Sequence, residues 1–141
     1  WYPVALSSEL LADKPLRVKL LCLQFVAFRD SAGVAHVLSD TCVHRGGALG
    51  LGKLRGDAVA CPYHGWEFGG DGRCTKIPSL GADAKLPARA KVDSYPVQEK
   101  YGIVFAFLGD LPEAERPPLY DIAEFGTPEW RAHTFVFDIN A

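Results

Sequence analysis

Two short stretches decide the fold and the chemistry of this chain: CVHRGG at residues 42–47 and CPYHGW at residues 61–66. Each stretch places a cysteine shortly before a histidine, as C-x-H in the first and C-x-x-H in the second, with glycine close by. Thiolates and imidazoles are the ligands of zinc, iron and iron–sulfur sites. Because two such pairs on facing glycine-rich loops can enclose one metal centre, Cys42, His44, Cys61 and His64 are the candidate ligands.

Two other interpretations of these pairs stay open at this point. The pairs could be unrelated, although both fall in the one segment that looks inserted. A structural zinc site is the second alternative. Such sites usually separate paired ligands by two to four residues, whereas a single residue separates Cys42 from His44. Zinc therefore fits the first pair poorly.

Outward from these stretches, the sequence predicts an all-β domain. Residues 39–78 hold many glycines and only short apolar runs, which indicates an inserted, loop-rich subdomain. Hairpins are predicted where apolar or β-branched runs flank a turn: 18–28 with 34–38, 67–68 with 73–75, and 95–100 with 103–108. We also expect a helical turn at 7–11, proline-rich coil at 111–128 with one turn near 120–125, and a last strand from His133 onward.

Length and composition limit the function classes. The chain has 141 residues, 48% hydrophobic and 23% charged, so we expect one compact domain over residues 1–141. The 14 glycines and 10 prolines favour many turns and short strands. A net charge of −2 gives no basic excess for nucleic acid. The longest apolar run, at 103–108, is too short to span a membrane.

Both ends of the sequence suggest a longer protein. The chain starts at Trp1 and contains no Met, and residues 135–141 have the pattern of a strand with no polar tail. We therefore expect a fragment of a longer chain. No signal peptide is visible, and a cytoplasmic location is expected.

Together, the stretches at residues 42–47 and 61–66 resemble the cluster-binding loops of Rieske 2Fe-2S proteins. More narrowly, HRG at 44–46, YHGW at 63–66, GRCTKIP at 72–78 and the opening WYPV at 1–4 are similar to the N-terminal domain of the terminal oxygenase component of Rieske non-heme iron oxygenases, the aromatic-ring-hydroxylating type. The resemblance covers nearly the whole chain. It implies a Rieske-type antiparallel β-sheet sandwich with an inserted cluster-binding subdomain at about residues 39–78.

The resemblance also implies the ligand set and the roles of its neighbours. Cys42 and Cys61 would hold one iron of a 2Fe-2S cluster, and His44 and His64 the other. Three glycines would leave backbone N–H groups free to approach the cluster sulfides, and a proline would stiffen the second loop. A tryptophan would pack beneath that loop, and an arginine would either help to dock an acidic electron donor or be a plain surface cation. These supporting residues are Arg45, Gly46, Gly47, Pro62, Gly65 and Trp66.

One departure from the wider Rieske family bears on the redox potential. Rieske proteins of respiratory complexes carry an additional, disulfide-forming cysteine in each loop and a serine hydroxyl where this chain has Trp66. With fewer donors to the cluster, the potential is expected near the low end of the Rieske range, roughly −150 mV.

The resemblance further implies a function. The domain would pass single electrons from a ferredoxin or flavin-dependent reductase to a mononuclear Fe(II) that activates dioxygen, in a homotrimer where that iron belongs to a neighbouring subunit. Two histidines and a carboxylate would hold that iron. Apart from the cluster ligands only His36 and His133 remain, so no catalytic residue is expected in this chain. A standalone Rieske ferredoxin is the alternative, and a structural zinc-binding module is a more remote one.

The remaining cysteines and histidines are expected to be structural. Cys22 lies in a predicted hydrophobic strand and is expected in the core. Cys74 is expected to pack near the cluster without binding iron. His36 and His133 fall on predicted strands and are expected to be solvated or hydrogen-bonded.

Overall fold

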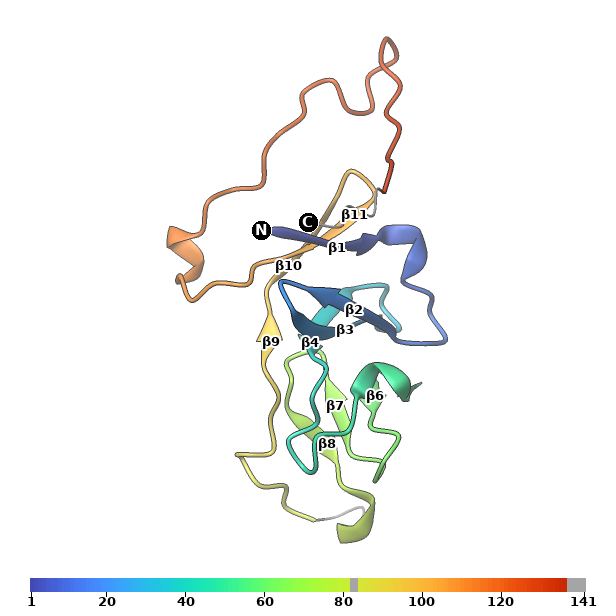
Figure 1. Cartoon of the computed structure of the whole chain (residues 1–141), viewed down its shortest axis with the longest axis vertical. Coiled ribbons are helices and arrows are strands. Elements are labelled where there is room, and N and C mark those ends of the chain that lie inside the picture. Colours follow the sequence, from blue (N-terminus) through green and yellow to red (C-terminus); the bar gives the residue numbers. More distant parts are fainter. Residues whose placement is uncertain (82–83, 137–141) are drawn as a thin grey trace. The chain divides into compact units, whose positions relative to one another are not determined.

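The chain forms two compact units, Trp1–Asp110 and Leu111–Ala141. The computed structural model describes residues 1–81 and 84–136. Within these residues the first unit consists of short strands and single 3₁₀ turns (Figure 1). In chain order they are β1 Tyr2–Leu6, η1 Ser7–Glu9, β2 Leu16–Leu20, β3 Leu23–Arg29, β4 Ala35–Ser39, η2 Leu49–Leu51, β5 Lys53–Arg55, β6 Ala58–Ala60, β7 Glu67–Gly69, β8 Cys74–Lys76, η3 Pro78–Leu80, β9 Ser94–Tyr95, β10 Val97–Lys100 and β11 Ile103–Ala106.

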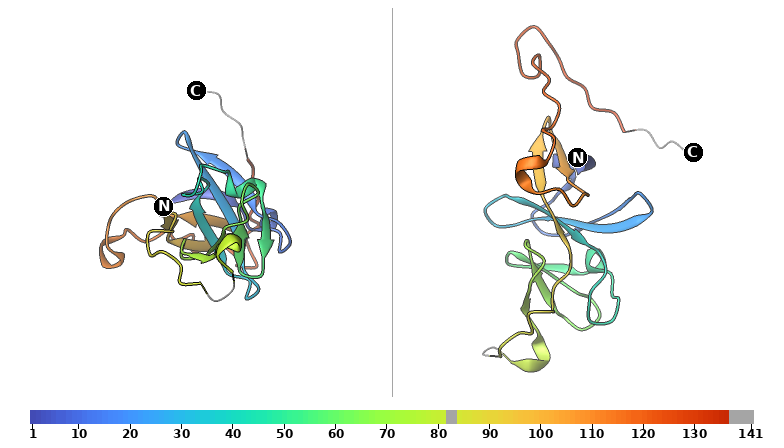
Figure 2. Two further views of the ribbon diagram at one scale, coloured as in Figure 1. Left: turned by 90° about the horizontal axis from the view of Figure 1, so that it is seen from below. Right: turned by 90° about the vertical axis from the view of Figure 1, so that its left-hand side faces the viewer.

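The strands form three antiparallel sheets. Their strand orders are β1-β11-β10, β2-β3-β4-β9 and β5-β6-β7-β8. The sheet of β2, β3 and β4 lies between the other two (Figure 2, right). The β5–β8 sheet is contributed by the chain between β4 and β9, so the prediction of an all-β fold with an inserted subdomain is confirmed. No helix in the described part of the chain has the length and apolar character needed to cross a membrane.

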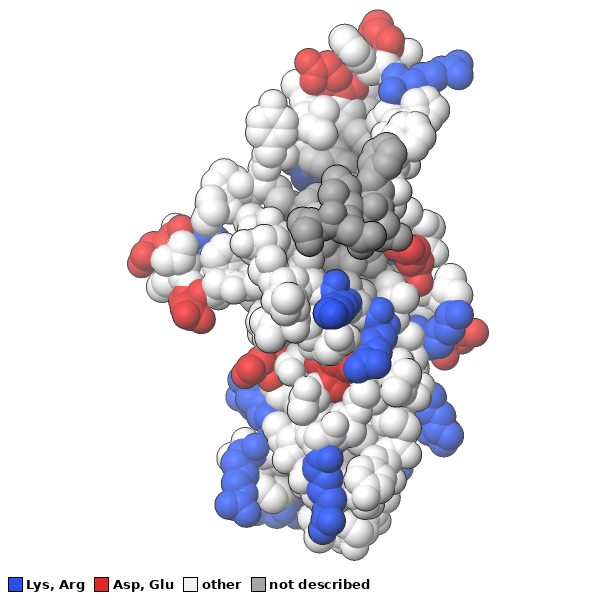
Figure 3. All heavy atoms as spheres, in the orientation of Figure 1, with Lys and Arg blue, Asp and Glu red and all other residues white. Residues whose placement is uncertain are grey.

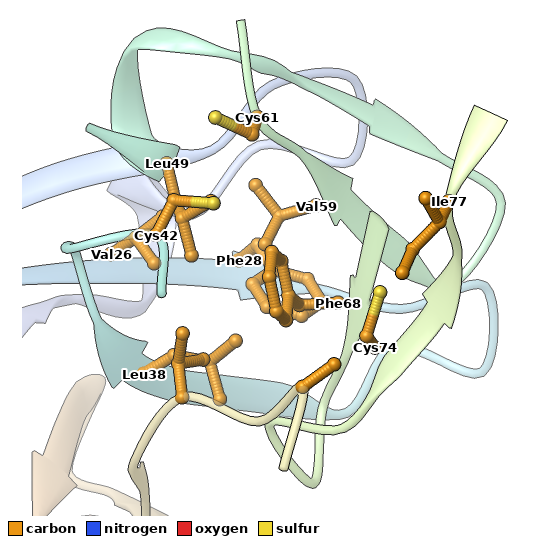
Figure 4. Packing of buried hydrophobic residues seen from close by; sticks show 12 residues of the cluster. Val26, Phe28, Leu38, Cys42, Leu49, Val59, Cys61, Phe68, Cys74 and Ile77 are labelled. Atoms are coloured by element: carbon orange, nitrogen blue, oxygen red, sulfur yellow. The ribbon is translucent and has the colours of Figure 1, made fainter. Parts of the chain in front are cut away.

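Strand β3 packs on both of its faces, which explains its unbroken apolar sequence FVAF at 25–28. Phe25 and Ala27 belong to a core shared with β1, β10 and β11. Val26 and Phe28 point to the opposite side, where they join a second core with Val59 and Phe68 of the inserted sheet. This second core also contains Cys42, Cys61 and Cys74 (Figure 4). The inserted subdomain is therefore held by the same strand that holds the rest of the unit.

The predicted strand 18–28 is wrong in one respect, because it is two strands joined by a tight turn. Leu21 and Cys22 make this turn with φ of 52° and 62°, and β2 and β3 pair on either side of it. Cys22 is consequently exposed and not in the core as predicted. The turn carries none of the Gly or Asn residues that usually mark such a conformation, so no local signal predicts it.

The other predicted elements are confirmed with two exceptions. Pro96 divides the predicted strand 95–100, so that β9 and β10 belong to different sheets. In the second unit, η4 spans Glu113–Glu115 and a turn joins Ile122 to Phe125, whereas residues 133–136 form no strand. The rest of the predicted last strand, 137–141, lies outside the described residues.

A buried aspartate ties the first ligand loop to the central sheet. Asp40, only 2% exposed, follows β4 directly. Its carboxylate accepts hydrogen bonds from Arg17 Nε of β2 and from the Gly50 backbone N–H, both at 2.6 Å. Its backbone N–H donates to the Gln24 carbonyl of β3 at 3.1 Å. These three bonds fix both ends of the segment that carries Cys42 and His44.

We predict that Asp40→Ala lowers the free energy of unfolding by about 2–3 kcal/mol, because it leaves the Gly50 N–H without its acceptor and Arg17 without its counter-ion. Asp71→Ala is the matched control. Asp71 pairs with Arg73 at 3.5 Å and accepts the Arg73 backbone N–H at 3.0 Å, with both side chains exposed, so its loss should cost about 1 kcal/mol or less. Urea denaturation of both variants measures the difference, and equal costs would show that Asp40 is no anchor.

A second prediction compares two glycines with similar backbone conformations. Gly33 and Gly72 have φ of 83° and 78°. A Cβ at Gly33 would meet open space, whereas a Cβ at Gly72 would collide with the Val92 carbonyl oxygen. Gly33→Ala should therefore lower the free energy of unfolding by about 1–2 kcal/mol, because of the left-handed conformation alone. Gly72→Ala should lower it clearly more, because the collision with the Val92 carbonyl is added. Thermal denaturation shows which of the two variants is less stable, and a smaller loss of stability for Gly72→Ala would contradict this prediction.

Candidate metal centre

The two predicted ligand loops have the same backbone hydrogen bonding. In the first, the Cys42 N–H donates to the Gly47 carbonyl at 2.9 Å and the Gly46 N–H donates to the Cys42 carbonyl at 2.8 Å. In the second, the Cys61 N–H donates to the Trp66 carbonyl at 2.8 Å and the Gly65 N–H donates to the Cys61 carbonyl at 3.0 Å. Each loop is thus six residues long, closed by its first residue, and the two are local copies of each other.

Glycine is required at the fifth position of both loops. Gly46 and Gly65 have φ of 68° and 72°, a left-handed conformation that is costly for other residues. Their own N–H groups bond the Cys42 and Cys61 carbonyls within the loops, so any N–H groups directed at a cluster would belong to other loop residues. Gly47 has a different role, since a Cβ there would lie 2.8 Å from Cys61 Sγ. The two loops can approach closely only because this side chain is absent.

The loops bring the two cysteines together in the second core. Cys42 and Cys61 are 2% and 4% exposed and are not joined by a disulfide. Both side chains belong to the second core, and Figure 4 shows both sulfurs at one edge of it. Burial, helped by the adjacent Cys61 thiol, raises the pKa of Cys42 to about 11. A nearby cation would reverse this effect, because it stabilises the thiolate.

The loops also bring the two histidines together, nearer to the protein surface than the two cysteines. The ring centroids of His44 and His64 are 4.6 Å apart at an interplanar angle of 65°. His44 is half-buried and stacks on Trp66 at 4.5 Å with only 5° between the rings. His64 is exposed and touches the Tyr63 ring at 3.9 Å. Desolvation, followed by repulsion from His64 and Arg45, lowers the pKa of His44 and so favours the neutral imidazole, which is the metal-binding form.

These side chains fit a two-iron cluster. Thiol lies beside thiol and imidazole beside imidazole, so the donors present themselves as two like pairs. In addition, His44 Nδ1 is buried and has no hydrogen-bond partner among the described residues. A buried polar atom without a partner is costly, and a metal ion would satisfy it. A pair of soft thiolates and a pair of neutral imidazoles suit the two irons of a mixed-ligand iron–sulfur cluster.

The residues predicted to support the site differ in how far they are buried. Trp66 packs against the second core and against His44, as expected for a wall beneath the second loop. Arg45 and Pro62 are exposed on their loops. Sequence reasoning missed Asp40, because nothing in the sequence shows that it is buried, and it missed Tyr63, which lies against His64.

The other cysteine and histidine candidates behave as structural residues. Cys74 is buried beside Ile77, and its Sγ donates to the Lys76 carbonyl at 3.3 Å (Figure 4). Its packing near the loop cysteines in the second core is as predicted. His36 on β4 is hydrogen-bonded to Asp30 at 2.9 Å. His133 lies exposed in the second unit.

Comparison with known proteins is consistent with this geometry. The family model described as the Rieske [2Fe-2S] domain matches residues 1–96. The phenoxybenzoate dioxygenase subunit alpha of Ectopseudomonas oleovorans is 40% identical over 88% of this chain and 30% of its own length. The oxygenase component of 3-ketosteroid-9-alpha-monooxygenase from Rhodococcus rhodochrous is 35% identical over 96% of this chain and 35% of its own.

A solved structure agrees with these relatives. Apo dicamba monooxygenase superimposes with a TM-score of 0.73 at 35% identity, over 84% of this chain and 37% of that one. This chain thus spans about a third of the length of these oxygenases. With a family match over most of its length and the two ligand loops in place, the chain belongs to the Rieske [2Fe-2S] domain family.

Proposed function

We propose that Cys42 and Cys61 bind one iron of a 2Fe-2S cluster and that His44 and His64 bind the other. The observation that carries this proposal is the pairing of like donors across two copies of one loop. The buried Nδ1 of His44 supports it, since this nitrogen has no hydrogen-bond partner among the described residues.

The cluster, when bound, would take up and release one electron at a time. The chain's own residues would set its surroundings. Trp66 holds the His44 ring in one orientation by stacking. The apolar side chains around Cys42 and Cys61 exclude water from the cysteine end. His64 is exposed and gives the histidine end a route to the surface. The cysteine end therefore borders the hydrophobic core, whereas the histidine end reaches the surface.

We further propose that the domain relays electrons from a ferredoxin or flavin-dependent reductase to a mononuclear non-heme iron of an oxygenase. Similarity to a dioxygenase subunit and to a monooxygenase component supports this role. The mononuclear iron would lie in a catalytic domain of the same or a neighbouring subunit, as in a homotrimer. Residues 1–141 would then act as the Rieske domain of a longer oxygenase chain.

Loading of the cluster is the direct test of the ligand set. Replacing Cys42 or Cys61 by Ser, or His44 or His64 by Ala, should abolish the brown colour and the content of two irons and two sulfides per chain. Cys22→Ser and Cys74→Ala are the controls, because the first is exposed and the second is a packing residue. Iron and acid-labile sulfide analysis measures the outcome. A colourless wild-type protein with one zinc per chain would overturn the assignment.

The relay role predicts a separation of electron uptake from oxygen chemistry. The cluster-loaded chain should be reduced by one electron per chain, followed by its visible spectrum. It should consume no dioxygen in a substrate-dependent manner, because no oxygen-activating iron is proposed within it. An oxygen electrode measures this second property. Substrate-dependent uptake by this chain would show that the catalytic iron is bound here.

A further inference from the structure

The outward face of the β5–β8 sheet is hollowed. An open cavity of about 860 Å³ lies over it. The walls come from η2, from β5 and from the ends of β7 and β8, and the second ligand loop closes one side. The lining residues on which the argument depends are Lys53, Arg55, Ala60, Cys61, Glu67 and Lys76.

The register of the sheet explains the hollow. Lys53 pairs with Ala60, Ala60 with Glu67, and Glu67 with Lys76, so these four residues form one row across the four strands. The adjacent row of Leu54, Val59 and Phe68 packs into the second core. The outward row therefore has Ala60 and Glu67 in its middle and a lysine at each edge. This gives a shallow floor with charged rims.

The rim of the hollow that β5 forms is positively charged. Lys76 pairs with Glu67 at 3.6 Å, but Lys53 and Arg55 are exposed and have no carboxylate partner among the described residues. The surrounding segment shares this sign. The chain between β4 and β9, residues 40–93, contains eight Lys or Arg and six Asp or Glu, a net charge of +2, whereas the whole chain carries −2. Figure 3 shows Lys and Arg gathered over the β6–β8 region on the face in view.

The hollow lies next to the cysteine end of the proposed cluster. Cys61 itself lines it, together with Pro62 and Gly65 of the same loop. The histidine end has a different surface. There Val43 and Tyr63 are exposed, at 48% and 62%, around a single cation, Arg45. An electron relay needs one surface that contacts its donor and another that contacts its acceptor. The cysteine end and the histidine end of the proposed cluster have surfaces of different chemistry.

We propose that the cationic hollow over β5–β8 is the docking site for the electron donor, and that this donor is an acidic [2Fe-2S] ferredoxin whose carboxylates lie against Lys53 and Arg55. This proposal rests on the proposed function of the cluster. One electron leaves the reduced ferredoxin, which is oxidised, and enters the centre held by the two loops, which is reduced. Only an electron passes between the two proteins, and no covalent bond between them is made or broken. Cationic clefts raise association rates with anionic partners in this way.

The test reverses the charge of the rim. The double variant Lys53→Glu/Arg55→Glu is compared with Lys14→Glu/Lys19→Glu, which makes the same change in net charge at exposed residues before and within β2. The probe is an acidic plant-type ferredoxin. Stopped-flow reduction of the cluster-loaded chain gives the electron-transfer rate, and calorimetry with the oxidised ferredoxin gives the Kd with or without the cluster. Dithionite reduction checks each cluster independently.

The rim variant should lose at least about tenfold in association rate at low ionic strength, and the loss should shrink at high salt. The Lys14/Lys19 control should stay within about twofold. Lys53→Gln/Arg55→Gln should fall between the wild type and the charge reversal. A rim variant that binds and is reduced like the wild type, while Arg45→Glu is slowed, would overturn the proposal and place the donor at the histidine end. A chain that binds ferredoxin at the rim but never assembles a cluster would refute the proposed function and leave the docking site standing.

Discussion

The packing of β3 between two cores is the constraint on which the rest of the structure depends. Because Phe25 and Ala27 face one core and Val26 and Phe28 the other, the central sheet is covered on both sides. The second core is the one that contains the loop cysteines. The candidate metal centre is therefore an extension of the hydrophobic core and not an appendage on a mobile insertion. Asp40 adds the only buried charge among the described residues, and it points toward the same loop.

The two ligand loops show how similar backbones can present different ligands. Both place glycine at the fifth position and close through the same pair of hydrogen bonds. The histidine stands third in one loop and fourth in the other. This shift by one residue leaves one ring half-buried against Trp66 and the other exposed beside Tyr63. Equal loops would have given equal environments, so the offset is what makes the two proposed ligands inequivalent.

Much of this architecture could be predicted from the sequence because its signals are local. The hairpin at Gly69–Gly72, the turn before Ile103 and the inserted segment all follow from turn residues and apolar runs. The predictions failed where contacts between different segments determine the conformation or the burial of a residue. The Leu21–Cys22 turn has no turn-forming residue, and its conformation follows from the pairing of β2 with β3. The burial of Asp40 depends on Arg17 and Gly50, which lie 23 and 10 residues away. The use of the Gly46 and Gly65 N–H groups depends on loop closure, which the glycine itself does not reveal.

The depth of the cysteine pair has a consequence for how the holoprotein is made. Both cysteines are buried in the second core together with Leu49 and Val59, and Cys61 also borders the surface hollow. A scaffold that hands over a preformed cluster has to reach these sulfurs before the inserted sheet settles onto β3, or else the loops have to part again. We therefore expect maturation to compete with the final folding step, so that the timing of iron–sulfur delivery during biogenesis decides how much of the protein becomes active.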